Sequence, residues 1–375
     1  MRIGIVTEYY YPSIGGVQEH VHHFAREARR LGHVARIVTS EMPDLAAADA
    51  AGGPGVAEAP DVLRVGRSVP LYLNGGFGRV SVGYGLSRTV RETLERERFD
   101  VVHVHCPLTP VLPWLAIHHA RCPVVGTFHT NFRPGRAWAL TQLWQRRYLE
   151  RLDAAVAVSH AAAGPYEQRL RASFRIIPNG VDTERFGSGQ RLERFDDGRL
   201  NVLWVGRLEP RNGLDVMIEA FALLRRSLPA RLLVVGDGPL RGRYEDRVPP
   251  ELRDEIVFAG VSRDDRPDWY ATADVYCAPT RIASFGVTLL EAMSAGKPVL
   301  ASDIAGFREV MQHEREGELL PPADPAAWAR ALARLASDRA LAAAYGARGK
   351  LTATRYAWPR VARQVLELYR AVGAA

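Results

Sequence analysis

Two arginines and one glutamate in the second half of the sequence have the types and positions to bind a ligand. Arg207 and Arg211 lie in VGRLEPRNG, between an apolar run and an amphipathic stretch. At the end of a strand and beside a helix N-terminus, two guanidinium groups would form a clamp for an anion. They could equally be solvated surface charges. Glu291, the lone acidic residue of VTLLEAMSA, could accept hydrogen bonds from two vicinal hydroxyls, as in a ribose.

Glycine-rich turns stand next to helices in both halves and could bring a ligand close to the backbone. Gly15 and Gly16 precede an amphipathic stretch in the first half, and ASFG precedes VTLLEAMSA in the second. Because glycine permits close approach and helix N-termini favour anions, both turns suit phosphate. A bare turn is the alternative at Gly15, and the missing G-x-G-x-x-G argues against a nicotinamide-dependent enzyme. The second turn and its helix supply the candidate contacts Ala283, Ser284, Phe285, Gly286, Val287 and Thr288.

Three histidines stand at the ends of strand-like runs. His103 and His105 end VVHVH with the two-residue spacing that places side chains on one face of a strand. A structural role is the simpler interpretation of His103. His129 follows PVVGT and is next to Thr130 and Asn131, so we predict a functional role for it. No third ligand has convincing spacing, and we therefore expect no metal site.

The elements that must position these residues follow from the alternation of the sequence. Short runs rich in β-branched residues alternate with longer amphipathic stretches, which predicts parallel sheets covered by helices. The pattern restarts after a polar interval at 183–199, which we interpret as a linker. The predicted domains are 1–185 and 186–355, with a helix at 356–375 that crosses back towards the first domain. Ligands of such doubly wound α/β domains bind outside the carboxyl ends of the strands.

Length and charge agree with two domains and anionic ligands. The 375 residues exceed the usual size of one compact core, and 47% hydrophobic residues are typical of a globular protein. The net charge is +7, and Lys297 and Lys350 are the only lysines among 49 basic residues. A basic surface favours phosphates or phospholipids. No basic tail or alternation of basic and aromatic residues points to nucleic acid, so we expect no nucleic-acid partner.

Cysteine usage and hydropathy predict a cytoplasmic protein. Cys106, Cys122 and Cys277 are scattered, without metal-ligand spacing, which is typical of a reduced compartment. We expect neither a signal peptide nor a membrane span, because no apolar run reaches about 18 residues. The segment 131–153 mixes arginines with tryptophans and could lie on an anionic bilayer. An ordinary helix packed on its own domain is the alternative.

Taken in order along nearly the whole chain, these motifs resemble the retaining glycosyltransferases of family 4. Such enzymes have the GT-B fold, in which two Rossmann-like domains face a central cleft. The resemblance rests on GGVQEHV, HVH, TFHTNF, IPNGVD, VGRLEPRNGLDVMIEAF, VVGDGP, FAG and SFGVTLLEAMSAGKPVLASDIAGFREV. It implies that the domain at 1–185 binds the acceptor and that the domain at 186–355 binds a nucleotide sugar. It also implies transfer of a hexose, with mannose favoured, from a GDP- or UDP-sugar with retention of configuration. No D-x-D motif occurs, and we expect neither a cofactor nor a metal.

The resemblance also assigns roles to individual residues. Gly15 and Gly16 would approach the donor phosphate and the reacting sugar, and His129 would lie beside that sugar. Arg207 would neutralise the departing diphosphate, and Glu291 would hold the ribose. His129 and Arg207 are therefore the expected catalytic residues.

One loop resembles a particular branch of the family. VPLYLNGGFGRV looks like the acceptor loop of the phosphatidylinositol mannosyltransferases, which use GDP-mannose at the inner membrane face. Asn74 and Arg79 match its asparagine and arginine, and Arg79 is a candidate partner for a lipid phosphate. Leu73 replaces an expected aromatic residue, and a plain surface loop is the alternative. The acceptor would be lipid-linked or a small polar molecule.

Two positions depart from the family pattern. The first glutamate of its E-x7-E motif would fall at Ala283, and a lysine would fall at Asn212. Loss of each charged hydrogen bond costs roughly 1.5–3 kcal/mol. Arg211 could replace the charge of the lysine. A catalytically weakened or inactive nucleotide-sugar-binding protein is therefore the second hypothesis, and an epimerase of related fold is a more distant third.

Overall fold

The chain forms two compact units in the computed structural model. Residues 1–12, 15–43, 61–73, 76–131, 141–170, 172–262 and 264–374 are described, without the side chains of 71–73 and 76–78. Unit 1 is Met1–Gly180 with Trp358–Ala375, and unit 2 is Val181–Ala357. The sequence had placed these divisions after residues 185 and 355. The expected linker at 183–199 instead carries two short helices whose side chains Phe186 and Phe195 are buried in unit 2.

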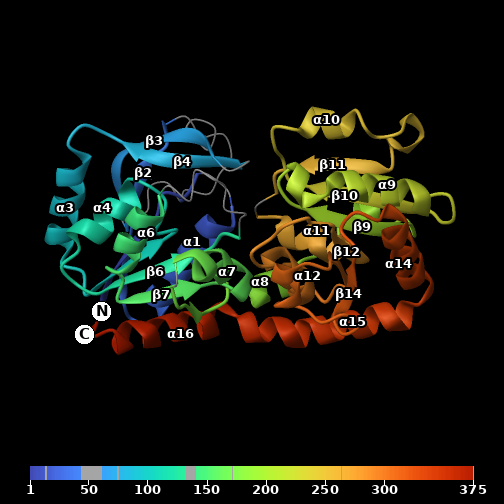
Figure 1. Cartoon of the computed structure of the whole chain (residues 1–375). Helices are drawn as coiled ribbons and strands as arrows, with labels where there is room; N and C mark the ends of the chain where they lie inside the picture. Colours follow the sequence, from blue (N-terminus) through green and yellow to red (C-terminus); the bar gives the residue numbers. More distant parts are fainter. Residues whose placement is uncertain are drawn as a thin grey trace. The chain divides into compact units, whose positions relative to one another are not determined.

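The sheet of unit 1 is parallel except at one edge (Figure 1). Its order is β4-β3-β2-β1-β5-β6-β7-β8, and only β4 runs antiparallel, as a hairpin with β3. The strands are β1 (Arg2–Val6), β2 (Val34–Glu41), β3 (Val62–Leu73), β4 (Gly76–Val82), β5 (Val101–His105), β6 (Val124–Phe128), β7 (Ala154–Ala157) and β8 (Arg175–Ile176). Every residue of β5 and β6 is buried, which explains their continuous apolar runs.

Helices flank this sheet and bring the C-terminus of the chain into unit 1. They include α1 (Gly16–Arg30), α3 (Leu86–Glu97), α4 (Leu112–His119), α6 (Gln142–Leu149), α7 (His160–Leu170) and α16 (Trp358–Ala371). Val21, Phe24 and Ala28 of α1 recur at helical spacing and are fully buried. They share one core with Val361 and Tyr369 of α16. The C-terminal helix is therefore an integral part of the first unit.

Unit 2 contains a wholly parallel sheet with the order β11-β10-β9-β12-β13-β14. Its strands are β9 (Leu200–Val205), β10 (Ala230–Val235), β11 (Ile256–Gly260), β12 (Val275–Ala278), β13 (Val299–Ser302) and β14 (Gly317–Leu320). Its helices are α8 (Thr183–Gly187), η2 (Glu193–Phe195), η3 (Pro210–Asn212), α9 (Leu214–Leu224), α10 (Arg241–Glu245), η4 (Pro250–Leu252), α11 (Arg266–Thr272), α12 (Val287–Ser294), α13 (Ala305–Arg308), α14 (Pro325–Ser337), α15 (Arg339–Ala353) and η5 (Thr354–Tyr356).

One glycine fixes how two loops of unit 2 meet at the carboxyl edge of its sheet. Gly213 stands between η3 and α9 with φ 72°. A Cβ at this position would lie 1.9 Å from the carbonyl oxygen of Pro279, which follows β12. Any side chain would therefore displace backbone as well as strain it. The loops that follow β9 and β12, which carry the arginines and the glycine-rich turn, are held against each other here.

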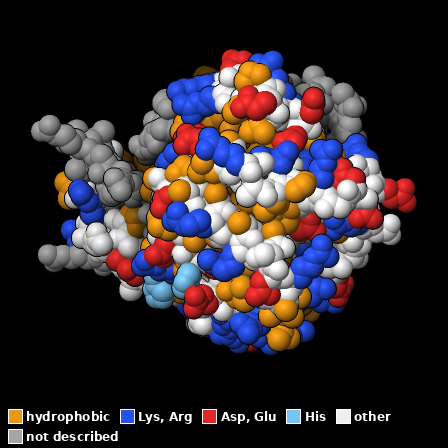
Figure 2. All heavy atoms as spheres, turned by 90° about the vertical axis from the view of Figure 1, so that its right-hand side faces the viewer, with side chains coloured by type: hydrophobic (Ala, Val, Ile, Leu, Met, Phe, Trp, Pro, Cys, Tyr) orange, Lys and Arg blue, Asp and Glu red, His pale blue; other side chains and the backbone are white. Residues whose placement is uncertain are grey.

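The outer surface of unit 2 carries mixed charge. Figure 2 shows basic and acidic side chains interspersed with apolar ones over the face that it presents. The net charge of +7 is therefore not gathered as one basic field on this face. Within the described ranges, no helix combines the length and apolarity needed to cross a bilayer.

Candidate functional site

A cluster of imidazoles lies at the carboxyl edge of the sheet of unit 1. His105 ends β5, and His129 directly follows β6, which pairs with β5 in parallel. Their rings stack at 5.2 Å, and His105 Nδ1 lies 2.9 Å from His129 Nε2, a hydrogen bond. His20 of α1 joins them, with its ring centre 5.3 Å from that of His105 and 4.9 Å from that of His129. We call His20, His105 and His129 the histidine triad.

Burial keeps the triad neutral. The exposed fractions of His20, His105 and His129 are 4%, 0% and 8%. Desolvation lowers the pKa of His20 to about 4, and it holds the pKa values of His105 and His129 well below their usual range. At pH 7 each ring therefore has one N–H group and one lone pair. His129 can donate or accept one hydrogen bond, but it presents no positive charge to a substrate.

His103 is part of the core beneath the triad. It is buried, with its Nε2 2.6 Å from Thr127 Oγ1 and its Nδ1 2.5 Å from the hydroxyl of Tyr369 on α16. Both ring nitrogens thus have partners, and the side chain ties β5 to β6 and to the C-terminal helix. This arrangement agrees with the structural role that the sequence favoured.

A buried carboxylate that sequence reasoning missed lies beside this edge. Glu8 lies two residues after the end of β1 and accepts hydrogen bonds from Ser81 Oγ at 2.6 Å, Ser81 N at 3.1 Å and Leu112 N at 3.1 Å. Burial raises the pKa of Glu8. The side chain joins the β3–β4 hairpin to the start of α4. Its signal in the sequence was a lone acidic residue immediately after the apolar run IGIVT.

The predicted acceptor residues belong to that hairpin. Arg79 lies on β4, where its Nε donates to Ser68 Oγ at 2.8 Å on the neighbouring strand β3. Asn74, the other predicted acceptor residue, lies outside the described residues. The structure thus places Arg79 on the hairpin that Glu8 anchors.

The two glycines at the start of α1 differ in the space around them. A Cβ at Gly15 would lie 2.8 Å from Oε1 of Gln18. Gly15 is the N-cap in extended backbone, and Gly16 begins the helix. Among the described residues, no heavy atom lies within 4 Å of the point where a Cβ of Gly16 would stand. The space beside Gly16 is therefore open to a ligand that approaches the first turn of this helix of 15 residues.

In unit 2, Glu209 holds the two predicted clamp arginines. Its Oε1 lies 3.2 Å from an Nη of Arg207, and its Oε2 lies 2.9 Å from Nε of Arg211. The arginine side chains are 44% and 56% exposed, whereas that of Glu209 is 11% exposed. Asn212 donates from Nδ2 to the carbonyl oxygen of Arg207 at 2.7 Å. The two arginines thus share one carboxylate, and an arriving phosphate would share both arginines with Glu209.

The glycine-rich turn before α12 packs against α13 and against Tyr356. Gly286 is the N-cap of α12, so Val287 and Thr288 lie in its first turn. Phe285 is buried, with its ring 5.9 Å from that of Tyr356. On α13, a Cβ at Gly306 would lie 2.4 Å from the carbonyl oxygen of Ala283, so backbone packs directly on backbone at this position. The expected N–H groups are present at the carboxyl edge of the sheet, where Ser284 also lies.

Glu291 has protein partners on both carboxylate oxygens. The side chain is 5% exposed, and its Oε1 lies 3.2 Å from an Nη of Arg266. Tyr270 donates its hydroxyl to Oε2 at 2.8 Å, and burial raises the pKa of Tyr270. Each carboxylate oxygen can accept a second hydrogen bond. Two hydroxyls of a ribose would therefore add to a preorganised carboxylate. Sequence reasoning missed Arg266 and Tyr270, because nothing in RPDWYAT points to a helix 21 residues away.

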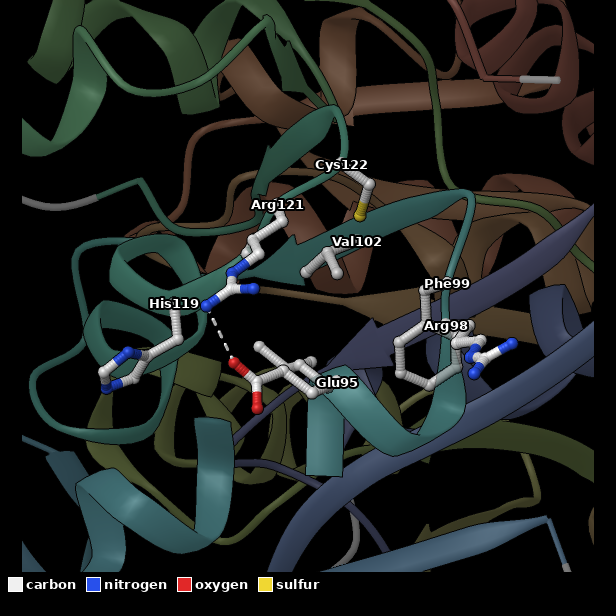
Figure 3. A pocket seen from close by; sticks show the side chains of 9 residues that line it. Glu95, Arg98, Phe99, Val102, His119, Arg121 and Cys122 are labelled. Atoms are coloured by element: carbon white, nitrogen blue, oxygen red, sulfur yellow. Dashed lines mark ion pairs between the residues drawn. The ribbon is translucent and has the colours of Figure 1, made fainter. Parts of the chain in front are cut away.

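A separate pocket lies at the opposite edge of the sheet of unit 1 (Figure 3). Its volume is about 580 Å³, and its walls are Leu94, Glu95, Arg98, Phe99, Val102, His119, Ala120, Arg121 and Cys122. Arg121 and Glu95 point toward each other and form an ion pair of 3.0 Å. The lining comes from the ends of α3 and α4 and the amino end of β5. The pocket therefore does not belong to the carboxyl-edge site.

Comparisons with known proteins identify the family. The model described as Glycosyltransferase Family 4 matches residues 14–185, and that described as Glycosyl transferases group 1 matches residues 199–338. A phosphatidyl-myo-inositol mannosyltransferase of Mycobacterium tuberculosis is 35% identical over 383 residues, covering 99% of this chain and 97% of that protein. The chain belongs to glycosyltransferase family 4. A second family member of the same description, from Mycolicibacterium smegmatis, is 34% identical, covering 100% of this chain and 95% of its own length.

Solved structures confirm the GT-B fold expected for family 4. HepE of Anabaena in complex with UDP superposes with a TM-score of 0.77 at 20% identity, covering 99% of this chain and 100% of that one. Sucrose-phosphate synthase of Thermosynechococcus elongatus gives 0.78 at 20% identity, covering 99% and 98%. The chain is therefore a glycosyltransferase of the GT-B class with two parallel-sheet α/β domains.

Proposed function

We propose that this glycosyltransferase moves mannose from GDP-mannose to an inositol phospholipid or a related lipid-linked or small polar acceptor, with retention and without a metal. The observation that carries the proposal is the match of 35% identity over nearly the full length of a phosphatidyl-myo-inositol mannosyltransferase. UDP as donor base is the alternative, since HepE was crystallised with UDP and UDP-glucose. Mannose is favoured because the full-length relatives carry that name.

The residues of unit 2 suit the donor. Transfer requires stabilisation of the charge that develops on the departing diphosphate while the sugar becomes oxocarbenium-like. Arg207 and Arg211 supply two permanent positive charges, and the first turn of α12 supplies backbone N–H groups. Glu291 would accept hydrogen bonds from the ribose hydroxyls. Asn212 replaces the lysine of the family pattern, and Arg211 beside it provides the charge.

The residues of unit 1 suit the sugar and the acceptor. His129, as a neutral imidazole, would hydrogen-bond the transferred sugar, and the open N-terminus of α1 at Gly16 would approach the donor phosphate. Arg79 on the anchored hairpin would pair with a phosphate of the acceptor. A donor phosphate oxygen would take the proton of the acceptor in a same-face attack that retains the configuration.

Action at the inner membrane face is part of the proposal. On α6, Leu143 is 80% exposed and Trp144 is 64% exposed, next to the exposed Arg146 and Arg147. Apolar and cationic side chains together favour an anionic lipid surface. Co-sedimentation with anionic vesicles at low salt, lost on Trp144→Ala, checks this contact, and equal sedimentation with neutral vesicles would contradict it.

Transfer is tested with radiolabelled GDP-mannose and UDP-sugars, offered with phosphatidylinositol vesicles and with soluble inositol phosphates. We expect labelled lipid from GDP-mannose in the presence of EDTA. Donor binding without transfer or hydrolysis would favour the second hypothesis, an inactive nucleotide-sugar-binding protein. That hypothesis rests on Ala283 and Asn212, which replace charged residues of the family pattern. A parallel thermal-shift series on Ala283→Glu tests whether position 283 faces the sugar. A donor-dependent gain over the parent chain is expected, and an unchanged shift would contradict that placement.

A further inference from the structure

The three histidines of the triad bring ring nitrogens close together, in the way that the ligands of a metal ion do. One ring nitrogen of each of His20, His105 and His129 lies within 4.8 Å of a ring nitrogen of the other two. Three converging imidazoles are a ligand set for a transition metal. We propose that the triad binds one divalent cation of the zinc class, and that this cation inhibits the protein rather than serving its reaction.

The spacing requires only a small adjustment to fit such an ion. Zinc binds imidazole nitrogens at about 2.0–2.1 Å in tetrahedral geometry, which places the nitrogens roughly 3.3 Å apart. His105 Nδ1 and His129 Nε2 are already 2.9 Å apart. A rotation of the His20 ring would bring in the third nitrogen. The ion would replace the His105–His129 hydrogen bond, and its proton would move to the outer nitrogen of one ring or leave.

Neighbouring groups orient the rings for this purpose. His20 donates from Nδ1 to Asn179 Oδ1 at 2.8 Å, which leaves Nε2 as its lone pair. An outer hydrogen bond of this kind orients most metal-binding histidines. His105 Nε2 is buried and has no hydrogen-bond partner among the described residues. An ion on Nδ1 of His105 would replace its hydrogen bond to His129 and place the proton of the ring on Nε2.

The charge and chemistry of the site select the class of ion. Imidazole suits zinc, copper and nickel, whereas magnesium and calcium require oxygen ligands, and the triad contains no carboxylate. The two positive charges of the buried ion need a counter-ion, so hydroxide or a phosphate oxygen would fill its fourth coordination position.

The inhibitory consequence rests on the proposed function, because it requires that His129 contacts the transferred sugar. A bound ion on Nε2 of His129 would fix the proton of that ring on Nδ1 and place positive charge beside a sugar that becomes oxocarbenium-like. Zinc at micromolar concentration should then lower transfer at least tenfold, and EDTA should restore it. Magnesium at the same concentration should have no effect.

Binding is measured first, without donor or acceptor, on the full chain freed of metals by a chelator. Calorimetric titration with Zn²⁺ should give one site per chain, and Co²⁺ should produce the visible absorption of a tetrahedral complex. His20→Ala should weaken binding at least tenfold. His118→Ala is the matched control, because this exposed histidine of the same unit should leave binding unchanged.

The test does not depend on the fold of a variant. X-ray absorption of the zinc-loaded native chain should show three imidazole ligands, and one or none would overturn the proposal. Equal affinity of a folded His20→Ala variant would overturn it as well. Tight binding by the triad without loss of transfer would leave the metal site standing, and it would contradict both the inhibition and the role of His129.

Discussion

The carboxyl edges of the two sheets hold opposite kinds of chemistry. In unit 1 the edge carries buried neutral imidazoles, and all of the eleven histidines of the chain except His313 belong to that unit. In unit 2 the corresponding edge carries permanent charges, with Glu209 between Arg207 and Arg211 and Arg266 beside Glu291. The same strand-end location therefore holds neutral hydrogen-bonding groups in one unit and charged groups in the other.

This difference separates how the two edges respond to pH and to substitution. Charges of arginine and of paired carboxylates persist over the whole physiological pH range. Buried neutral histidines are compatible with full stability only above a pH of about 6.5, because at lower pH the unfolded chain binds protons that the folded chain does not. We therefore expect acid to lower the stability of unit 1. Removal of charged groups in unit 2 should instead weaken donor binding and transfer.

The largest expected effect is acid destabilisation of unit 1. The pKa values of His20 and His103 fall to about 4 and about 3 because both rings are desolvated. Unfolded histidine titrates near 6.5, so below that pH the unfolded chain binds more protons and stability falls until the folded pKa is reached. At pH 5 each such histidine costs about 2 kcal/mol relative to pH 7.

Urea unfolding at pH 7 and pH 5, with EDTA present, checks this expectation. Proteolysis at each urea concentration, mapped by mass spectrometry, reports which unit opens. Unit 1 should open at clearly lower urea at pH 5, while the transition of unit 2 moves little. Loss of unit 2 first at pH 5 would contradict the comparison.

The next effect is loss of transfer on Arg207→Ala. Removing one preorganised donor to a developing negative charge costs roughly a hundredfold in kcat. The donor KM should change less, because Arg211 remains. Steady-state kinetics with saturating acceptor measures the split. Arg330→Ala, at an exposed position of the same unit, is the matched control. A kcat equal to that of the parent chain would contradict a role of Arg207 in the reaction.

A smaller effect is expected for Tyr270→Phe, which deletes the hydroxyl that donates to Glu291 at 2.8 Å. A hydrogen bond to a charged group contributes about 1.5–3 kcal/mol, so the donor KM should rise roughly tenfold or more with little change in kcat. Tyr356→Phe removes a hydrogen bond to a neutral carbonyl oxygen, that of Glu309, and serves as the comparison. Equal donor KM values for the two variants would mean that Glu291 does not need Tyr270 to bind the donor.

The smallest effect is expected for Glu8→Gln in unit 1. The amide keeps the shape but replaces one acceptor oxygen by a donor, so part of the link from Ser81 to Leu112 is lost. The acceptor KM should rise severalfold while the donor KM stays constant, because the β3–β4 hairpin loses its anchor. Substrate titrations measure both constants, and a rise in the donor KM alone would contradict this assignment.

Local sequence patterns predicted the architecture and the residues at the carboxyl edges of the sheets, because strands, helices and turns depend on residues that are contiguous in the sequence. Apolar runs such as VVHVH and PVVGT become buried strands, and Gly286 caps α12 as its position in ASFG indicated. Contacts between distant segments were not predictable in this way. His20 joins His105 and His129 from another helix, and no sequence spacing reports which helix packs over which strand end.

Side-chain pairing within the site was equally hidden from the sequence. Glu209 stands between two arginines in GRLEPRNG, yet only the rotamers place one carboxylate oxygen on each guanidinium group. The segment 183–199 was interpreted as a linker because it is polar. Two of its apolar residues, Phe186 and Phe195, are buried and anchor it in unit 2.

The stereochemistry of the product tests the central claim most directly. The metal-free chain is incubated with GDP-α-mannose and phosphatidylinositol vesicles in EDTA, and the anomeric configuration of the lipid product is read by NMR. The account predicts an α-mannoside, formed with no added metal. A β-mannoside, or free mannose without a lipid product, would contradict it.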